Sequence, residues 1–563
     1  MNKPVYLSAP GIVCAAGSGR DALWSAVTDG NNSCIKKTSV QGKEFYSARI
    51  DECLLDKGRD LNSRFDMKIV RIELCALLQI EDFIHKAISL YGCERVGVCA
   101  GSCDNGSELS VASHREYFNT GKFPESYSLE VQGADYVATC IKERYGIEGP
   151  SLAFSTACSS SAGAIVKACQ MIRSGEVDAV IAGGADIASD TVLLGFDSLE
   201  AVSPEKTNPF SRNRKGITLG DGAAFFVLSR DCLSLDDEVV LVAGYGESSD
   251  AYHVTSPDPE GRGAEKAMNA ALISAGIQAE SIDYLNLHGT GTHLNDSMEA
   301  KAVDRVFKDY KVPCSSTKSE TGHTLGAAGA LEAAVCYETI VRNGHSEKKV
   351  LPVQCWDGEK DEGFPELNIM SSGNLCGRTC IQYCMSNSFA FGGSNVSLIL
   401  SGEAFVPQRI EGNALQEMLP HRGKMLLLSR VTGHNVREKT VTAEYDVTSD
   451  CIFYDDKKGG IPSWVGFEIM GQSVSALAAI CRTVRRDIDR ARTGVILSVS
   501  DFKSDKAVLE NNSTVCIRVK EYFCADDVSQ YDCVLYERDV AVITARITVM
   551  EIKDMKEKLC QKK

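Results

Sequence analysis

The sequence predicts a protein in two parts, an α/β fold in residues 1–402 and a smaller α+β fold in residues 413–563, with a linker over residues 403–412. In the first part, apolar runs typical of buried strands, such as residues 95–101 and 179–185, alternate with segments of helical periodicity. This alternation predicts largely parallel sheets covered by helices. In the second part, one long apolar helix precedes several strand-like stretches, which predicts an antiparallel sheet around a single helix. The chain of 563 residues also exceeds what one hydrophobic core supports.

Taken in order, the first part opens with a short strand and glycine turn at residues 3–15 and a polar helix at about residues 20–30. A second set of strands is expected later in this part, at residues 239–245, 284–287 and 396–400.

Composition and charge restrict the kind of protein. A hydrophobic content of 44% with 24% charged residues is typical of a globular protein rather than a disordered one. The formal net charge of −16 disfavours nucleic acid or an anionic membrane as a general partner. The 23 cysteines form no C-x-x-C pair, so neither a zinc module nor a disulfide framework is indicated, and no metal is expected. We expect a cytoplasmic protein without a transmembrane segment.

A cysteine lies where a predicted strand gives way to a predicted helix, in the stretch Phe154-Ser155-Thr156-Ala157-Cys158-Ser159-Ser160-Ser161. A helix N-terminus favours the thiolate form and so lowers a cysteine pKa. We therefore expect Cys158 to be a nucleophile. The alternative, a buried structural cysteine, is the better interpretation for most of the other cysteines of the chain.

Three later stretches also read as loops at strand ends, residues 287–296, 317–329 and 387–395. The first contains His288 and the second His323, and each histidine alone would be weak evidence. Together with the Cys158 stretch, in this order and spacing, they resemble the β-ketoacyl-acyl-carrier-protein synthases of the decarboxylating Cys-His-His type. The resemblance covers roughly residues 1–402 and implies the five-layered αβαβα thiolase-like fold, normally found as a homodimer.

The resemblance assigns roles to five residues of the expected site. Condensation of thioesters needs a nucleophile that holds one acyl chain and donors that stabilise the enolate formed from the second substrate. Cys158 fits the first need, and His288 and His323 fit the second. Lys318 and Glu332 match the supporting charges of the family.

Five further residues are expected to bind the substrate. The hydroxyls of Thr290 and Thr292 lie where the resemblance places the pantetheine arm, and Phe391 matches a gating phenylalanine. Gly392 and Gly393 are expected to let backbone N–H groups converge on an oxyanion. The pattern departs at the residue before Phe391, where alanine replaces the usual glycine.

Related reactions fit less well. A thiolase needs a second catalytic cysteine, which residues 388–393 lack. A Cys-His-Asn synthase is disfavoured by the two histidines, so Asn387 and Asn395 are interpreted as turn residues. A non-catalytic chain-length factor would lack Cys158.

A helix starting at Arg64 carries three basic residues on one face, Arg64, Lys68 and Arg71. A solvated helix face is the simpler interpretation. The resemblance suggests instead a docking face for an acidic carrier protein.

The second part begins with a short helix over about residues 413–419, followed by a strand pair at about 425–433 and 438–447 and by a long helix from Ser463 to about Arg486. Four strand-like stretches close the chain, near 494–502, 513–522, 530–537 and 540–551. One helix wrapped by an antiparallel sheet is the hot-dog arrangement. The Pro-His-Arg element at 420–422 and the Pro-Ser-Trp-Val-Gly element at 462–466 resemble 3-hydroxyacyl-carrier-protein dehydratases of the aryl-polyene type.

The usual catalytic histidine of such dehydratases is missing. It stands fourteen residues before the helical glutamate, and that position before Glu468 is Tyr454. Dehydration needs a base for the α-proton and an acid for the leaving hydroxyl, so Glu468 with His421 is the expected pair. A structural role for His421, in which it holds loop carbonyls, is as good an interpretation as catalysis. His434 is expected in a hairpin turn, exposed to solvent.

Together the two parts predict two steps of one cycle, condensation to a 3-ketoacyl thioester and dehydration of a 3-hydroxyacyl thioester, on chains carried by the phosphopantetheine of acyl carrier protein. The chain has no G-x-G-x-x-G fingerprint after a strand, so we expect a separate ketoreductase and no cofactor bound by this chain. No enoyl reductase is evident, which favours a polyene product over a saturated fatty acid. The alternatives for the second part are a non-catalytic acyl-binding or dimerising module and a thioesterase, since hot-dog folds support several functions.

Overall fold

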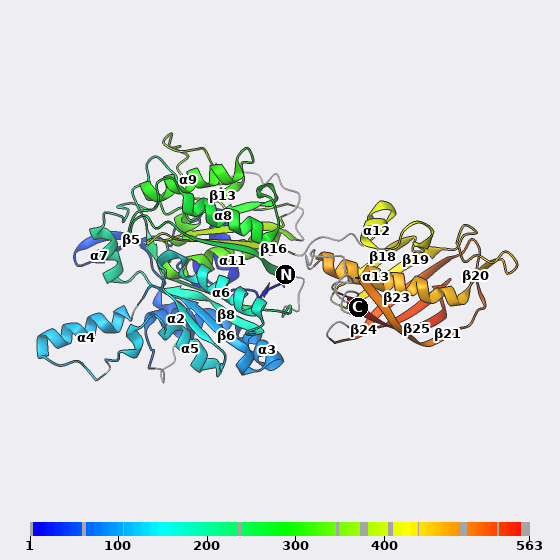
Figure 1. Cartoon of the computed structure of the whole chain (residues 1–563). Coiled ribbons are helices and arrows are strands. Elements are labelled where there is room, and N and C mark those ends of the chain that lie inside the picture. The colour runs from blue at the N-terminus through cyan, green and yellow to red at the C-terminus, as the bar shows by residue number, and fades with distance from the viewer. Residues whose placement is uncertain are drawn as a thin grey trace, which may run out of the picture. The chain divides into compact units, whose positions relative to one another are not determined.

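The computed structural model divides into two compact units, residues 2–402 and residues 403–563 with Met1. Each unit is described by itself (Figure 1). The described residues are 4–58, 64–104, 106–125, 127–233, 238–344, 348–371, 381–402, 409–436, 438–484, 493–525 and 528–552.

The first unit is built on a 13-stranded sheet, and its strands follow one another across the main path in the order β14-β13-β12-β15-β16-β11-β1-β10-β8-β6-β7. The strands that position the site are β6 (Val96–Gly101), β7 (Ser151–Phe154), β8 (Ala179–Asp186), β10 (Gly222–Ser229), β11 (Val240–Ser249), β12 (Tyr284–Asn286), β13 (Pro313–Ser315), β15 (Tyr383–Phe389) and β16 (Ser394–Gly402). The other strands of that path are β1 (Tyr6–Leu7) and β14 (Asn368–Ile369).

The sheet is mixed, so the prediction of largely parallel sheets is wrong. β6 runs parallel to β7 and β8, and β12 runs parallel to β13 and β15. In the middle of the sheet, however, β10 is antiparallel to β8, and β16 is antiparallel to β11 and β15. A short connection over residues 390–393 joins β15 directly to β16, where a parallel pair would need a helical crossover.

Helices form the remaining layers and confirm the five-layered fold (Figure 1). The helices α6 (Ser160–Ser174) and α11 (Ala328–Gly344) contact each other in the middle layer and share one apolar core with strands of the sheet. One outer layer contains α2 (Lys68–Leu77), α3 (Glu81–Tyr91) and α5 (Tyr136–Tyr145). The other contains α8 (Arg262–Ala275) and α9 (His293–Phe307). The middle helices are almost wholly buried, so polar side chains on them need partners inside the protein.

The second unit consists of the long helix α13 (Gly466–Val484) and a seven-stranded antiparallel sheet in the order β17-β18-β19-β23-β24-β25-β21. Apolar residues of α13 pack with inward-facing residues of these strands, as the hot-dog arrangement requires. The strands are β17 (Ile410–Glu411), β18 (Arg430–Asn435), β19 (Thr440–Asp446), β21 (Thr493–Ser504), β23 (Thr514–Ala525), β24 (Val528–Glu537) and β25 (Val540–Ile552).

Three boundaries differ from the sequence prediction. Residues 410–411 form β17 and pair with β18, so this unit begins inside the expected linker, whose residues 403–408 lie outside the described part. The short helix α12 (Gly412–Met418) follows directly. β18 begins at Arg430 because residues 423–425 form a 3-10 turn, and His434 pairs with Val441 within the sheet rather than lying in a turn.

Among the described residues, one helical stretch is long and apolar enough to cross a membrane, Ser463–Val484. It comprises α13 and the turn before it, and 67% of its most apolar window is buried inside the unit. Its apolar residues therefore form the core of this unit.

Candidate active sites

The cysteine of the first unit lies on a sharp turn between strand and helix. β7 ends at Phe154, residues 157–159 form a 3-10 turn, and α6 begins at Ser160. Ala157 has a φ of 52°, a conformation that costs a non-glycine residue free energy and needs support from its surroundings. The Ser160 hydroxyl supplies that support, because it accepts a bond from the N–H of Thr156 (2.9 Å) and donates one to the carbonyl of Ala157 (2.6 Å).

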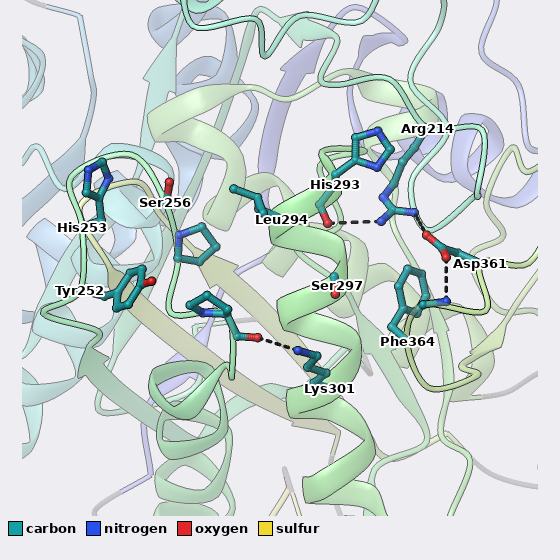
Figure 2. Close-up of a pocket in the computed structure, with 13 residues that line it drawn as sticks. Arg214, Tyr252, His253, Ser256, His293, Leu294, Ser297, Lys301, Asp361 and Phe364 are labelled. Atoms are coloured by element: carbon teal, nitrogen blue, oxygen red, sulfur yellow. Dashed lines mark hydrogen bonds and ion pairs between the residues drawn. The ribbon is translucent and has the colours of Figure 1, made fainter.

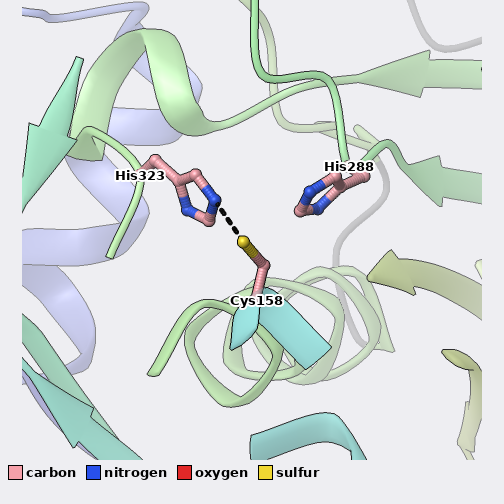
Figure 3. A group of neighbouring side chains, drawn as sticks. All are labelled: Cys158, His288 and His323. Carbon is pink, nitrogen blue, oxygen red and sulfur yellow. Dashed lines mark hydrogen bonds between the residues drawn. The ribbon is translucent and has the colours of Figure 1, made fainter. Parts of the chain in front are cut away.

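Cys158, His288 and His323 come together in the interior of the unit (Figure 3). Nε2 of His323 lies 3.0 Å from Sγ of Cys158, and the two imidazole rings are 5.4 Å apart and nearly perpendicular. The three side chains have exposed fractions of 7%, 1% and 2%. Their sulfur and nitrogen atoms lie within 4.8 Å of one another, so a single small group can contact all three.

The neighbours of each imidazole indicate which nitrogen carries the proton. The N–H of Leu325 donates to Nδ1 of His323 (3.3 Å), and Nζ of Lys318 lies 3.4 Å from Nδ1 of His288. Because both neighbours are donors, both Nδ1 atoms act as acceptors, and Nε2 of each neutral ring carries the hydrogen. Burial and the charge of Lys318 hold the pKa of both histidines well below the usual value, which keeps the rings neutral.

Lys318 and Glu332 form a buried ion pair behind the histidines. Nζ of Lys318 also donates to the carbonyl oxygen of His288 (2.5 Å). Burial raises the pKa of Glu332 to about 7, although the charge of Lys318 lowers it. The pair thus joins α10 (Lys318–Thr321) to α11 and holds His288 by its main chain.

The pKa of the Cys158 thiol differs from the sequence expectation. Burial raises it to about 11, while Lys318 and the backbone N–H of Phe391 act in the opposite direction. The expectation that the position at a helix N-terminus lowers the Cys158 pKa is therefore wrong for the site without substrate. Desolvation penalises the charged form more than these favourable neighbours stabilise it.

Two buried carboxylates that sequence reasoning missed hold the loop that carries His288. Glu299 accepts the N–H groups of His288 and Gly289 (both 2.8 Å). Asp296 accepts those of Thr290 (3.0 Å) and Gly291 (3.1 Å). Four consecutive N–H groups are thus satisfied by the first turns of α9. One sequence feature could have indicated these contacts. Asp296 and Glu299 are two acidic residues three positions apart, at the start of the helix that directly follows the loop with His288.

The expected substrate-binding residues fall into two groups. Thr292 and Phe391 line a cavity of about 270 Å³, and the hydroxyls of Thr290 and Thr292 lie 3.0 Å apart. The N–H groups of Gly392 and Gly393 already donate to the carbonyls of Val254 and Ala390, so they do not converge on an oxyanion as expected.

The N–H near the Cys158 sulfur is that of Phe391. Asn387 and Asn395 are buried strand residues rather than turn residues. Asn387 donates to Glu299 (3.2 Å), and Asn395 donates to Asp250 (2.7 Å).

A larger cavity of about 490 Å³ lies next to the first and shares Ser256, Pro257, His293 and Leu294 with it. Figure 2 shows its lining along one side of α9, with Lys301 directed to a proline carbonyl and Arg214 paired with Asp361. The two cavities form a continuous lining from Phe391 outward.

The second unit brings its two predicted catalytic residues together. Nε2 of His421 lies 3.6 Å from Oε1 of Glu468, at one end of a cavity of about 320 Å³. Gln472, one turn further along α13, donates to the same Glu468 oxygen (3.0 Å) and to the carbonyl of Met425 (2.8 Å). The glutamine therefore fixes the position of the carboxylate.

The interpretation of His421 as a holder of loop carbonyls receives no support, because its Nδ1 has no hydrogen-bond partner within the described residues. Tyr454, which occupies the usual histidine position, packs against the apolar core and does not line the cavity.

Comparisons with known proteins agree with this geometry. Residues 2–232 match the N-terminal domain of β-ketoacyl synthases and residues 239–344 the C-terminal domain, while residues 413–560 match the ApeP dehydratase family. Nodulation protein E of Rhizobium meliloti is 32% identical, over 71% of this chain and 99% of that protein. The 3-oxoacyl-[acyl-carrier-protein] synthase 2 of Coxiella burnetii is also 32% identical, over 70% of this chain and 98% of that protein. The chain belongs to the β-ketoacyl synthase family.

A solved structure supports the same assignment for this synthase. The ketosynthase ApeO in complex with its chain length factor ApeC, from Xenorhabdus doucetiae, is 37% identical with a TM-score of 0.62, over 71% of this chain and 98% of that chain. The synthase unit therefore catalyses condensation to a 3-ketoacyl thioester, and the C-terminal unit is a dehydratase domain, as predicted. Substrates of such enzymes are carried on the phosphopantetheine of acyl carrier protein.

The expected docking face of the synthase is neutralised by its own acids. Arg64 pairs with Glu130 and Glu143, Lys68 lies 2.8 Å from Asp221, and Arg71 lies 2.7 Å from Asp66. The helix itself begins at Lys68 rather than at Arg64. The simpler interpretation, an ordinary helix face, agrees better with these contacts.

Proposed function

We propose that Cys158 holds the growing acyl chain and that His288 and His323 together stabilise the enolate of malonyl-acyl carrier protein. The observation that carries this proposal is the pair of neutral imidazoles whose protonated Nε2 atoms lie beside the Cys158 sulfur. A cluster of two histidines and a cysteine would also suit a metal ion by spacing alone. Membership of the synthase family favours acyl transfer.

In the first half-reaction, Sγ of Cys158 attacks the thioester carbonyl of the acyl carrier protein. The C–S bond to the pantetheine sulfur breaks, and the thiol proton passes to that leaving sulfur. The backbone N–H of Phe391 is placed to stabilise the oxyanion that forms. Because burial raises the pKa of the thiol to about 11, the attacking group starts as the thiol whose proton is passed to the leaving sulfur.

In the second half-reaction, the bond between the malonyl methylene carbon and its carboxylate breaks and carbon dioxide leaves. The electron pair forms an enolate, whose oxygen accepts hydrogen bonds from Nε2 of His288 and His323. The enolate carbon then attacks the acyl group on Cys158, and the cysteine sulfur departs as a thiolate, which takes up a proton from water to restore the thiol. Lys318 and Glu332 orient His288 and do not react.

The route of the pantetheine arm is proposed to pass Thr290 and Thr292 and to be gated by Phe391. Thr292 and Phe391 line one cavity, the Thr290 hydroxyl lies 3.0 Å from that of Thr292, and the backbone N–H of Phe391 lies beside the Cys158 sulfur. Gly392 and Gly393 serve this gate through their backbone conformation, since both have a positive φ.

For the dehydratase unit, we propose that Glu468 and His421 remove the α-proton and deliver a proton to the leaving 3-hydroxyl, respectively. Their contact in a cavity with apolar and small lining residues supports this assignment. The C–O bond breaks, water leaves, and a 2-enoyl thioester remains.

The partners proposed are acyl carrier protein, a separate ketoreductase and a second copy of this chain. Within the part of the chain that the structure describes, β7 lies at one end of the sheet of the first unit and β21 at one end of the sheet of the second, each with one edge unpaired. β21 exposes five apolar side chains, Val495, Ile496, Leu497, Val499 and Phe502. Exposed edges of this kind are usually covered, which supports a homodimer. We place the protein in the cytoplasm and its product among polyenes.

One experiment tests both units in the full chain. Acyl carrier protein loaded with an acyl chain is added, and the modified cysteine is mapped by peptide mass spectrometry. An adduct on a cysteine other than Cys158 would refute the first proposal.

To test the dehydratase unit, a Cys158→Ala variant is given 3-hydroxyacyl carrier protein, and the expected product is the enoyl species. Release of free acid instead would make the second unit a thioesterase, and an unchanged substrate would make it a binding module.

A further inference from the structure

The cavity of the dehydratase unit extends along one face of its central helix. Six residues of α13 line it at helical spacing, Glu468, Gly471, Val474, Ser475, Ala478 and Arg482. The small residues Gly471, Ser475 and Ala478 leave room between the helix and the strands β21, β24 and β25, which supply the opposite wall. The cavity is therefore an elongated channel with Glu468 at one end and Arg482 at the other.

Among the described residues of this lining, charged side chains are found at the two ends: Glu468 with His421 at the reacting end, and Arg482 at the other. We propose that Arg482 forms an anion subsite for the phosphodiester of the phosphopantetheine arm. The inference rests on the proposed role of Glu468 and goes beyond it by naming how the arm is held.

The position of the anion follows from the size of the substrate carrier. A carrier protein cannot enter a cavity of about 320 Å³, so its phosphodiester must stay at the surface while the thioester reaches Glu468. Arg482 is partly exposed at the end of α13, whereas the side chains of Val474 and Ala476 along the helix are buried. The guanidinium thus reaches the surface, where the phosphodiester must remain. Because Glu468 at the other end is also partly exposed (24%), it is the positive charge of Arg482 that identifies this end as the place of the anion.

The distance from Glu468 to Arg482 is compatible with the length of the pantetheine arm. Glu468 and Arg482 are fourteen residues apart, about 21 Å along a helix at about 1.5 Å per residue. The arginine side chain leans back toward the helix N-terminus and shortens this span. A pantetheine arm has about 13 bonds from sulfur to phosphorus, which at the extension of a polypeptide is about 15 Å.

The chemistry of arginine also fits. Guanidinium groups present five N–H donors in a planar fork that matches phosphate oxygens, so a contact elsewhere leaves donors for a ligand. A purely structural role is the competing explanation, because a cation in the last turn of a helix stabilises the helix dipole. The two explanations differ in whether the effect of Arg482 depends on a phosphate in the substrate.

The test compares Arg482→Gln with the parent in the full chain, using 3-hydroxyacyl thioesters of pantetheine and of 4′-phosphopantetheine. We expect kcat/KM for the phosphorylated substrate to fall about tenfold, through KM, with the pantetheine thioester unaffected. Arg546→Gln is the matched control, since Arg546 also lies in this unit, pairs with Asp532 and does not line the cavity.

Equal losses for both substrates, or no loss for either, would overturn the proposal. If the parent dehydrates none of the thioesters, the proposed catalytic function fails, and calorimetry with 4′-phosphopantetheine and pantetheine still decides the subsite. Tighter binding of the phosphorylated arm that is lost in Arg482→Gln supports it, and equal binding of the two arms refutes it.

Discussion

The two sites of this chain control their reactive groups in different ways. Cys158, His288 and His323 are at most 7% exposed, and burial shifts the pKa of all three toward their neutral forms. Glu468 and His421 have side chains that are 24% and 26% exposed, and their contact with each other is a loose 3.6 Å. The condensing site is thus desolvated before substrate arrives, whereas the proposed catalytic pair of the dehydratase unit is still partly open to solvent.

The sharpest way to separate the two sites is to remove the nucleophile. In Cys158→Ala we expect condensation to fall by at least about 10⁴-fold, because the variant lacks the proposed nucleophile that holds the acyl chain. Dehydration should continue at the parent rate, and both activities are measured by mass spectrometry of the carrier-bound products. Residual condensation within tenfold of the parent would show that another residue carries the chain.

The reciprocal variant is Glu468→Gln, for which we expect dehydration to fall about 10³-fold while condensation is unchanged. Glutamine retains the shape and the contact with Gln472 but cannot accept the α-proton. His421→Ala should give a comparable loss if the histidine is the acid. A variant that only melts at a lower temperature and keeps its rate would return His421 to a structural role.

Replacing the histidines of the condensing site tests preorganisation itself. His288→Ala and His323→Ala should each slow malonyl decarboxylation by about 10²-fold or more, because each removes one hydrogen bond to the enolate. Acylation of Cys158 should be less affected. Decarboxylation is followed as carbon dioxide release from malonyl carrier protein, and a parent-like rate in either variant would make that histidine structural.

The smallest expected effect concerns pH and stability in the synthase unit. Burial raises the pKa of Glu320 to about 8, from an ordinary value of 4.5. Between these values the folded protein holds a proton that the unfolded chain has released, so the free energy of unfolding falls as the pH rises through this window. Glu320→Gln should remove this dependence, which amounts to a few kcal/mol at most, about 1.4 kcal/mol per pKa unit.

Melting temperatures of the full chain at about pH 5 and about pH 8 provide the measurement for that variant. Glu44→Gln is the control, because Glu44 is exposed on β5 (Lys43–Ala48). An identical pH dependence in parent, control and Glu320→Gln would show that the buried carboxyl does not contribute.

Much of the first site was predictable because its residues follow recognisable strands. Cys158 and His288 each lie within a few residues of a strand end, where local periodicity and short motifs are informative, whereas His323 follows the short helix α10. The raised pKa of Cys158 was not predictable, since desolvation depends on the helices and loops that cover the site. The contact of the Phe391 N–H with Cys158 was not predictable either, and neither were the hydrogen bonds from His288 and Gly289 to Glu299. Both depend on tertiary contacts.

In the second unit the order of the helix and the closing strands was predictable, and the pairing of Glu468 with His421 follows from the fold. The mixed sheet of the first unit was not predictable, because a buried strand shows the same apolar run whether its neighbour is parallel or antiparallel. The strand β17 was missed because two residues are too short to show a period.

The burial of Cys158 has a practical consequence for chemical labelling. Among the described cysteines, Cys53, Cys232 and Cys524 are exposed, whereas Cys158 is buried with a thiol pKa of about 11. A general alkylating reagent at neutral pH is therefore expected to modify surface thiols well before it reaches Cys158, the proposed nucleophile. A covalent inhibitor of this enzyme must instead imitate the pantetheine-linked acyl chain, so that its reactive carbon is delivered along the route that the substrate itself uses.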